Sequence, residues 1–558
     1  MLNLKQAIQD DIETGIKEAF GDLKKDIPVV VRIADDVEHG DYASPIALSL
    51  SKILKKKPLE IVEEIVKHMP KKEYLGRVTA AEPGFLNVRI SPGWLTARLD
   101  NVLDQDVTAE LTLGKGKSVN LEFISANPTG PLTIGNIRSA FPADTLGNVF
   151  QAVGYNVTRE YYFNDAGQQI KKLGESILRR ILQTGEYPEE LYQGEYVKDV
   201  AQKVAEQFRE NEGKEFSTKD LEDADLILRL GKAAATMLMA HIKDTIANVL
   251  KITFTSWVSE QQIRDSGAID AVLEKLRKQG DAYDEDGAVW FKSTKYGDEK
   301  DKVLVKSNGE FAYIMPDLGY HENKFEREFD LIFTFVGADH LDQMKKVRQA
   351  MEVLGHDVSK LHFPINQWFR LIKDGKPVKL SKRRGNITTP EELIAEVGYD
   401  ATRFFFLQHD LQSQMDFDLD LAKERSEKNP VYYVQYAYVR LQSILRRAKE
   451  EGVIKEVGEV MELTSHAELT HTAEIALMKQ MYRLPEVLVD IAESFAVHQL
   501  AYYAHDLASA VHSFYKQVRV LGGDRGELIM HRLQLVLAAR AVLGKTLDLL
   551  GISKPDVM

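Results

Sequence analysis

Residues 126–140 constrain the fold of this chain most, because they join a strand-like run to a helix-like run through a turn of glycine and proline. The apolar run Val119–Ile124 before the turn is typical of a buried strand, and Ile137–Val153 after it is typical of a helix. Backbone N–H groups at the start of a helix have no partner within it and lie at the positive end of its dipole. The turn therefore predicts a site for an anion such as phosphate.

A second element far downstream fits the first. Residues 379–386 read Lys-Leu-Ser-Lys-Arg-Arg-Gly-Asn, a basic loop closed by glycine. Lysines such as Lys379 and Lys382 can neutralise negative charge that develops when a phosphoryl group is transferred. Small and flexible residues suit a loop that closes over a ligand and reopens. We therefore expect the turn to hold a nucleotide and the loop to neutralise its departing phosphates.

These two elements resemble the signature motifs of class I aminoacyl-tRNA synthetases, His-Ile-Gly-His and Lys-Met-Ser-Lys-Ser, in that order. Further segments resemble the arginyl-tRNA synthetase family within this class: Glu122–Pro131, Tyr161–Gly167, Tyr313–Asp317 with Tyr320 and His321, and Asn429–Tyr436. The resemblance runs over nearly the whole chain, from His39 to Ile552. Several independent motifs in one order make it specific to this family.

The chain departs from the family at the first signature, where Thr133 replaces the first histidine and Asn136 the second. Their hydroxyl and amide groups can donate hydrogen bonds but carry no charge, and charge-assisted hydrogen bonds are about twice as strong. Two outcomes stay open, a weaker adenylation step or compensation by Arg138 or His340. The alternative function is a non-catalytic tRNA-binding or regulatory paralogue, although a pure binder has no need of the intact basic loop.

The resemblance implies a reaction in two steps. ATP activates L-arginine to arginyl-adenylate with release of pyrophosphate, and the arginyl group then passes to the terminal adenosine of tRNA(Arg). The family needs bound tRNA for the first step. Magnesium is expected to accompany ATP, and no metal or organic cofactor is expected to be built in. The same class acting on glutamine or cysteine is a nearer alternative, and cysteine is disfavoured because its synthetase grips the thiol with zinc through ligands that this chain lacks.

Recognition of arginine requires a deep carboxylate, which can grip a planar guanidinium through two parallel hydrogen bonds. By resemblance, Asp317 fills this role with Tyr313 one helical turn before it. Glu122 and Asn127 match the residues that hold the ammonium and carboxylate of the substrate. Ser125 and Asp339 are further candidates for the arginine site. The residues expected at ATP are Thr133, Gly135, Asn136, His340, Lys379, Ser381 and Lys382, and the catalytic ones among them are Thr133, Asn136, Lys379 and Lys382.

At 558 residues the chain is too long for one core. We expect a multidomain α/β protein with an α+β N-terminal domain over 1–108, a Rossmann-like catalytic domain over 109–390, a connecting segment over 391–428 and an all-α bundle over 429–558. Alternating strand and helix, as in Leu331–Val336 followed by Leu341–Leu354, predicts a parallel sheet that binds ligands at the carboxyl ends of its strands. Long amphipathic helices over about 170–255 predict an insertion between the two halves of this domain.

Both end domains are expected to contact tRNA, by resemblance. The N-terminal domain of the family contacts the tRNA elbow, and Tyr42 is a candidate for stacking on a base, with a plain structural turn as the equal alternative. The family uses the C-terminal bundle for the anticodon, and Tyr436 and Arg440 are the candidates for contact there. Core packing explains some of the neighbouring tyrosines.

Composition excludes several other classes of protein. The chain has no cysteine, which excludes disulfides and cysteine-ligated zinc. We find no apolar stretch near the length that spans a bilayer, and acidic residues at Asp10, Asp11, Glu13 and Glu18 are unlike a signal peptide. The net charge of −13 argues only mildly against tRNA, because binding depends on local basic patches. A cytoplasmic monomer is expected.

Overall fold

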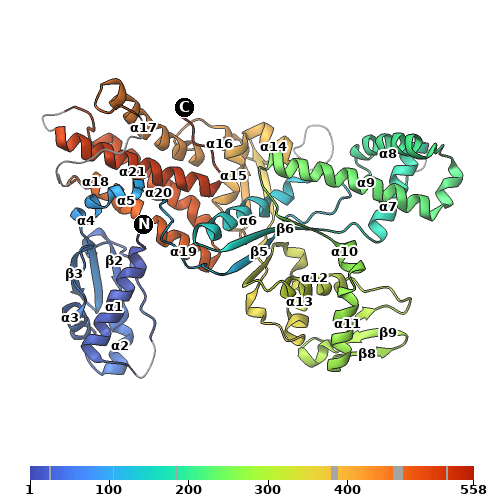
Figure 1. Ribbon diagram of the computed structural model, residues 1–558, viewed down its shortest axis with the longest axis horizontal. Helices are drawn as coiled ribbons and strands as arrows, with labels where there is room; N and C mark the ends of the chain where they lie inside the picture. The colour runs from blue at the N-terminus through green and yellow to red at the C-terminus, as the bar shows by residue number, and fades with distance from the viewer. Residues whose placement is uncertain (24–26, 105, 184–186, 379–387, 457–468, 523–525) are drawn as a thin grey trace. The chain divides into compact units, whose positions relative to one another are not determined.

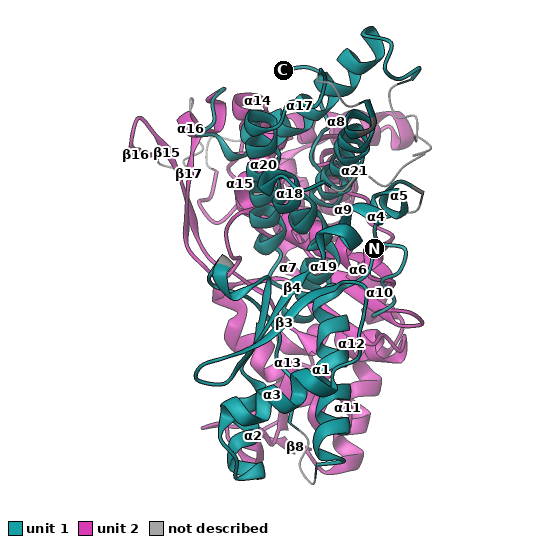
Figure 2. Ribbon diagram, turned by 90° about the vertical axis from the view of Figure 1, so that its left-hand side faces the viewer, with its two compact units in different colours: residues 1–113, 425–558 teal, residues 114–424 magenta. Residues whose placement is uncertain are grey.

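The computed structural model describes residues 1–558 except 24–26, 105, 184–186, 379–387, 457–468 and 523–525. The chain divides into two compact units, one of residues 1–113 with 425–558 and the other of residues 114–424 (Figure 2). The predicted basic loop over 379–386 lies wholly outside the described residues. The finer division into four domains stays a prediction.

A five-stranded parallel sheet forms the centre of the second unit, in the order β13-β11-β5-β6-β7. Its strands are β5 (Ser118–Glu122), β6 (Asn156–Phe163), β7 (Ser256–Ser259), β11 (Leu331–Thr334) and β13 (Leu361–His362). The chain builds outward from β5 in both directions, through β6 and β7 on one side and through β11 and β13 on the other. The strand order therefore reverses between β5 and β11, and α6 (Ile134–Ala152) leads from β5 to β6 as predicted (Figure 1).

The helical insertion lies between the neighbouring strands β6 and β7, within one half of the sheet, and not between its two halves as predicted. It comprises α7 (Gln168–Leu182), α8 (Tyr196–Glu212), η2 (Thr218–Glu222), α9 (Ala224–Asp244) and the π turn η3 (Thr245–Val249). The three long helices gather into a lobe with its own apolar core, which includes Leu173, Val204 and Leu230 (Figure 1). Helices α7 and α9 approach closely at Gly174, where an added Cβ would lie 1.8 Å from the carbonyl oxygen of Ile227.

A second connection, between β7 and β11, carries a small antiparallel sheet that the sequence did not predict. Three strands of four residues each leave too short a pattern to separate from turns. The elements are α10 (Glu260–Asp265), α11 (Ala268–Gln279), β8 (Ala282–Glu285), β9 (Ala288–Phe291), η4 (Ser293–Tyr296), β10 (Lys302–Val305) and α12 (Ile314–Glu326). After β11 follow β12 (Val336–Gly337), η5 (Ala338–His340), α13 (Leu341–Val353) and η6 (Val358–Lys360).

The predicted connecting segment is folded, and most of it belongs to the second unit. The elements after β13 are β14 (Ile365–Asn366), β15 (Phe369–Lys373), β16 (Lys376–Val378), α14 (Pro390–Val397), α15 (Tyr399–Leu407), β17 (Met415–Asp418) and α16 (Leu419–Lys423). Strand β15 pairs with both β16 and β17. Helix α15 is joined to α6 by a buried ion pair between Arg403 and Asp144, 2.6 Å from Nη2 to Oδ2.

The N-terminal part of the first unit packs helices on an antiparallel sheet of order β1-β2-β4-β3. The apolar spacing predicts a helix over Leu4–Phe20, and α1 has these bounds. Asn3 accepts a hydrogen bond from the Gln6 N–H at 3.0 Å, and Gly21 ends the helix with φ 71°. The remaining elements are β1 (Arg32–Ile33), η1 (Val37–His39), β2 (Tyr42–Ser44), α2 (Ile46–Leu54), α3 (Pro58–His68), β3 (Leu75–Ala81), β4 (Phe85–Ile90), α4 (Pro92–Ala97) and α5 (Leu99–Asp104).

The C-terminal part of the first unit is a helical bundle, as predicted. Its helices are α17 (Pro430–Glu450), α18 (Thr472–Tyr482), α19 (Leu484–Ser494), α20 (His498–Gln517) and α21 (Gly526–Leu550). The apolar spacing over Ala473–Phe495 predicts one helix, but the structure has two there, so this prediction is wrong. The chain breaks at Arg483 because Pro485 has no N–H to donate and so occupies the first turn of a new helix. No helix in the described part of the chain has the length and apolar character to cross a membrane.

Candidate active site

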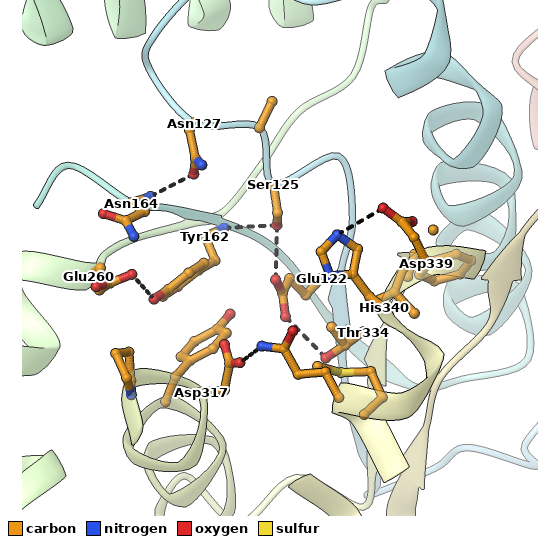
Figure 3. Close-up of a pocket in the computed structure, with 18 of the residues that line it drawn as sticks. Glu122, Ser125, Asn127, Tyr162, Asn164, Glu260, Asp317, Thr334, Asp339 and His340 are labelled. Carbon is orange, nitrogen blue, oxygen red and sulfur yellow. Dashed lines mark hydrogen bonds and ion pairs between the residues drawn. The ribbon is translucent and has the colours of Figure 1, made fainter. Parts of the chain in front are cut away.

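A cavity of about 910 Å³ opens at the carboxyl ends of β5 and β11. Glu122 and Thr334, the last residues of these strands, stand opposite each other in the sheet, and the Thr334 hydroxyl donates to Glu122 Oε2 at 3.0 Å. Open parallel sheets bind ligands where their strand order reverses, and the cavity lies at that point. Its walls come from the turn after β5, from α12 and from residues 334–343 (Figure 3).

The charge of Glu122 is balanced within the protein by Lys324 of α12. The Lys324 ammonium is fully buried and lies 2.6 Å from Glu122 Oε2, and it also donates to Thr334 Oγ1 at 2.9 Å. The Ser125 hydroxyl donates to the other carboxylate oxygen, Oε1, at 2.9 Å. A carboxylate oxygen accepts more than one hydrogen bond, so Oε1 can still receive a substrate ammonium. The sequence analysis missed Lys324, whose only sequence signal is a lysine among the buried residues of α12.

Asp317 is a half-buried carboxyl group of the cavity that forms no ion pair with another described residue. Its Oδ2 accepts a hydrogen bond from the amide of Gln343. Burial raises the pKa of Asp317 to about 7 against the effect of that hydrogen bond, and the nearby carboxylates of Glu122 and Glu260 raise it further. The site therefore holds a carboxyl that gains its charge most readily when a cation arrives.

Glu260 is a third carboxylate of the cavity, and the sequence analysis missed it. It is the first residue of α10, directly after β7, where the carboxyl end of a strand is itself a signal for a ligand-facing residue. Arg264 lies 2.6 Å from Glu260 Oε1, and the Tyr162 hydroxyl donates to Oε2 at 2.9 Å. Burial raises the pKa of Tyr162, so its hydroxyl stays protonated as a donor. Tyr162 stacks on Tyr320 at 4.4 Å between ring centroids and forms an aromatic wall.

The remaining candidates for the arginine site lie nearer the surface. Tyr313 lines the cavity and is 75% exposed. The Asp339 side chain is 70% exposed and lies 3.7 Å from His340 Nε2, on the side of the cavity away from Glu260 (Figure 3). An exposed carboxylate does not meet the expectation of a deep partner for guanidinium, which leaves Asp317 as the better candidate.

The turn after β5 is held in a strained conformation. Ile124 and Ser125 have φ of 67° and 43°, a left-handed region that residues with side chains rarely adopt. The Tyr162 N–H donates to Ser125 Oγ at 3.2 Å, and the Tyr161 hydroxyl both accepts from the Ala126 N–H at 3.0 Å and donates to its carbonyl at 2.8 Å. Strain of this kind persists where the surroundings over-determine it.

The start of α6 offers fewer donors to a phosphate than the sequence predicted. The N–H and the hydroxyl of Thr133 both donate to Asn136 Oδ1, at 2.8 and 3.0 Å. The Ile134 N–H donates to the carbonyl of Thr388, just beyond the basic loop, at 3.0 Å. Within the described part of the chain, the groups left to donate at this helix start are the backbone N–H of Gly135 and the side-chain amide nitrogen of Asn136. Both residues line the cavity.

Arg138 does not replace the missing histidines by direct contact, so that alternative is corrected. Its guanidinium donates to the carbonyl oxygens of Asp410 at 2.7 Å, Ser413 at 3.0 Å, Leu411 at 3.3 Å and Phe406 at 3.4 Å. Burial lowers the pKa of Arg138 to about 10, and the side chain therefore stays charged at neutral pH. Arg138 anchors the segment after α15 to α6.

The three candidates for tRNA contact have different surroundings. The stacking expectation for Tyr42 is corrected, because its ring is only 4% exposed in β2 and its hydroxyl donates to Glu486 at 2.9 Å. Tyr436 and Arg440 lie together in α17, with the guanidinium 4.5 Å from the centre of the Tyr436 ring. Arg440 donates to His512 Nδ1 at 2.8 Å, and burial lowers the pKa of His512, which keeps its ring a neutral acceptor.

Comparison with known proteins identifies the class first. A family model described as the catalytic domain of class I tRNA synthetases (R) matches residues 98–410, in agreement with the parallel sheet and the turn at its switch point. Models described as the arginyl tRNA synthetase N-terminal domain and the DALR anticodon binding domain match residues 6–90 and 434–558.

Full-length relatives identify the family. The arginine–tRNA ligase of Bacillus licheniformis is 38% identical over 100% of each chain, and that of Bacillus subtilis is 36% identical over 100% of this chain and 99% of its own. The fold is that of the Thermus thermophilus arginyl-tRNA synthetase, with a TM-score of 0.79, 21% identity and full coverage of both chains. The chain belongs to the arginyl-tRNA synthetase family.

Proposed function

We propose that this chain is an arginine–tRNA ligase that catalyses both steps of arginylation. Relatives that match it over its whole length are ligases of this kind, which favours the enzyme over a non-catalytic tRNA-binding paralogue and over a synthetase for glutamine or cysteine. The observation that carries the proposal is Asp317, a half-buried carboxyl that lines the cavity and forms no ion pair with another described residue.

The charges of the cavity complement arginine. Glu122 is paired with Lys324 and Glu260 with Arg264, which leaves Asp317 to receive the guanidinium through two parallel hydrogen bonds. Glu122 Oε1 is proposed to accept the α-ammonium group of the substrate. Ser125 and Asn127, on the turn above, are proposed to orient the substrate carboxylate, and Tyr313 to border the guanidinium end. Citrulline has the same shape without the charge and should be rejected.

Adenylation requires positioning and charge stabilisation more than acid–base chemistry, because the arginine carboxylate is ionised at neutral pH. One carboxylate oxygen forms a bond to the α-phosphorus of ATP. The bond from that phosphorus to the oxygen bridging to the β-phosphate breaks, and pyrophosphate leaves with the electron pair. We assign the Gly135 N–H and the Asn136 amide to the phosphates and His340 to the nucleotide at the rim.

Lys379, Ser381 and Lys382 are proposed to neutralise the departing pyrophosphate, with Mg²⁺ arriving as the counter-ion of ATP. The terminal adenosine of tRNA(Arg) then attacks the arginyl carbonyl through its 2′-hydroxyl, and AMP leaves. Tyr436 and Arg440 are proposed to contact the anticodon through stacking and cation–π contacts. We further propose that the enzyme is a cytoplasmic monomer.

Charging of tRNA(Arg) with a panel of amino acids tests the function. We expect arginine to be attached and citrulline, glutamine and cysteine to give no product above background. Equal charging with citrulline would show that the cavity does not recognise the charge of the guanidinium group. If glutamine were the only amino acid attached, the proposed function would be wrong and the chain would be a synthetase for glutamine.

A further inference from the structure

Tyr196 links the helical insertion to the turn between β5 and α6, called here the phosphate turn. Tyr196, the first residue of α8, donates its hydroxyl to the carbonyl oxygen of Thr129 at 2.7 Å. Its half-buried ring packs against the apolar core of the insertion. Burial raises the pKa of Tyr196 to about 12, so the hydroxyl stays protonated and donates throughout the neutral range.

Gly130 allows this close approach. A Cβ at Gly130 would lie 3.0 Å from the Tyr196 hydroxyl oxygen and 3.2 Å from the adjoining ring carbon, closer than carbon atoms normally approach. Gly130 is not among the glycines with positive φ, so the backbone of the turn does not itself require glycine there. The missing side chain therefore serves the contact with Tyr196.

The two halves of the turn are held by different parts of the fold. Tyr161 and Asn164 of β6 and its end hold the first half, through Ala126 and through the Asn127 side chain, whose Oδ1 accepts from the Asn164 N–H at 3.2 Å. In the described part of the chain, the bond from Tyr196 is the one hydrogen bond by which another element holds Thr129. Thr129 leads within a few residues to Gly135, whose N–H has no partner among the described residues and can donate to a phosphate.

We propose that Tyr196 is a positioning residue, through which the helical insertion sets the geometry of the phosphate turn for adenylation. The inference rests on the proposed function. A turn held at Thr129 keeps the start of α6 aimed at the phosphates, whereas the arginine site depends on Asp317, Glu122 and Lys324, which Tyr196 does not contact. Loss of the bond should therefore affect the use of ATP and leave arginine binding unchanged.

The first test compares Tyr196→Phe with Tyr187→Phe. Tyr187 is a matched control, because its hydroxyl, like that of Tyr196, donates to a backbone carbonyl. Its acceptor is Tyr192 of the insertion, at 2.8 Å, and not a residue of the turn. The readouts are KM and kcat for ATP and for arginine in tRNA charging, with thermal unfolding as a check on folding. We expect kcat/KM for ATP to fall about twofold to tenfold in Tyr196→Phe, the range of one neutral hydrogen bond, with KM for arginine unchanged.

The second test is a double-mutant cycle with Gly130→Ala. If both residues act through one contact, the added methyl group should cost less in the Tyr196→Phe background, where the hydroxyl oxygen is gone, and the two effects should not add. Equal kinetics for Tyr196→Phe and Tyr187→Phe, or equal losses for ATP and arginine, or strict additivity, would each overturn the inference. An unmodified protein that fails to charge tRNA would instead overturn the proposed function.

Discussion

In the proposed function, the two halves of the cavity recognise their ligands by different means. The arginine half uses buried side-chain charges, in which Lys324 balances Glu122, Arg264 balances Glu260, and Asp317 remains for the substrate. The phosphate half would use the Gly135 N–H and the Asn136 side-chain amide at the start of α6, since the N–H groups of Thr133 and Ile134 donate within the protein. A charge is lost with one substitution, whereas a backbone site tolerates exchange of the side chains around it. This difference explains how Thr133 and Asn136 can stand where the family has histidines.

The largest effect is expected from Asp317→Asn. The substitution keeps the shape and leaves the guanidinium without a counter-charge in a buried site, which typically costs about 3 to 5 kcal/mol. We expect kcat/KM for arginine to fall by a factor on the order of 10² to 10³ while KM for ATP is little changed. The control is Asp339→Asn at the exposed rim. Unchanged arginine kinetics in Asp317→Asn would transfer the specificity role to Glu260 or Asp339.

Lys382→Ala should have the next largest effect, in the phosphate half. The ammonium acts on charge that develops in the transition state, so kcat for adenylation should fall much more than the affinity for ATP, by about 3 kcal/mol or a factor on the order of 10². Single-turnover release of pyrophosphate checks it. A raised KM for ATP with unchanged kcat would contradict the role given to the loop.

The double variant Thr133→Ala with Asn136→Ala measures how much of the phosphate half depends on side chains. Each neutral hydrogen bond contributes roughly 0.5 to 1.5 kcal/mol, so charging should slow by a factor of about 5 to 100. Restoring histidine at both positions should raise the rate if the turn still accommodates two imidazoles. A loss as large as that of Asp317→Asn would refute the idea that this half rests mainly on the backbone.

The smallest effect is the pH dependence of arginine binding. Asp317 has a raised pKa, near 7, so it is protonated below that pH and arginine must displace the proton. KM for arginine should therefore rise by about tenfold from pH 8 to pH 6, while KM for ATP stays nearly level. In Asp317→Asn this slope should disappear. Folding stability changes with pH in the opposite direction to arginine affinity. The folded protein holds the Asp317 proton more tightly than the unfolded chain, so stability falls as pH rises through 7.

Local signals allowed prediction of single elements, and contacts between distant residues limited it. Asn3 and Gly21 mark the two ends of α1 in the sequence. Pro485 starts a new helix, but it stands inside a run of apolar spacing that by itself predicts one continuous helix. The role of Lys324 can be recognised only in the folded structure, because its partner Glu122 is 202 positions away in the sequence. The burial of Tyr42 likewise depends on Glu486, in a distant helix.

The motifs located the cavity better than they described its chemistry. Glu122, Ser125, Asn127, Asp317 and His340 all line it, as the resemblance led us to expect. What the motifs omitted is the balance of charge, since neither Glu260 nor Lys324 lies in a quoted motif. The pairing of Thr133 with Asn136 also depends on the backbone at the start of α6, which no residue pattern specifies.

The central claim is that a phosphate site without the two signature histidines, together with Asp317 as the counter-charge for the guanidinium, supports arginylation. Its most direct test is single-turnover formation of arginyl-tRNA by the unmodified protein in excess over tRNA(Arg), with ATP, Mg²⁺ and either arginine or citrulline. We predict arginyl-tRNA at a measurable rate and no product from citrulline. Tight binding of tRNA(Arg) with no arginyl-tRNA, even at high enzyme concentration, would contradict the account and favour a binding paralogue.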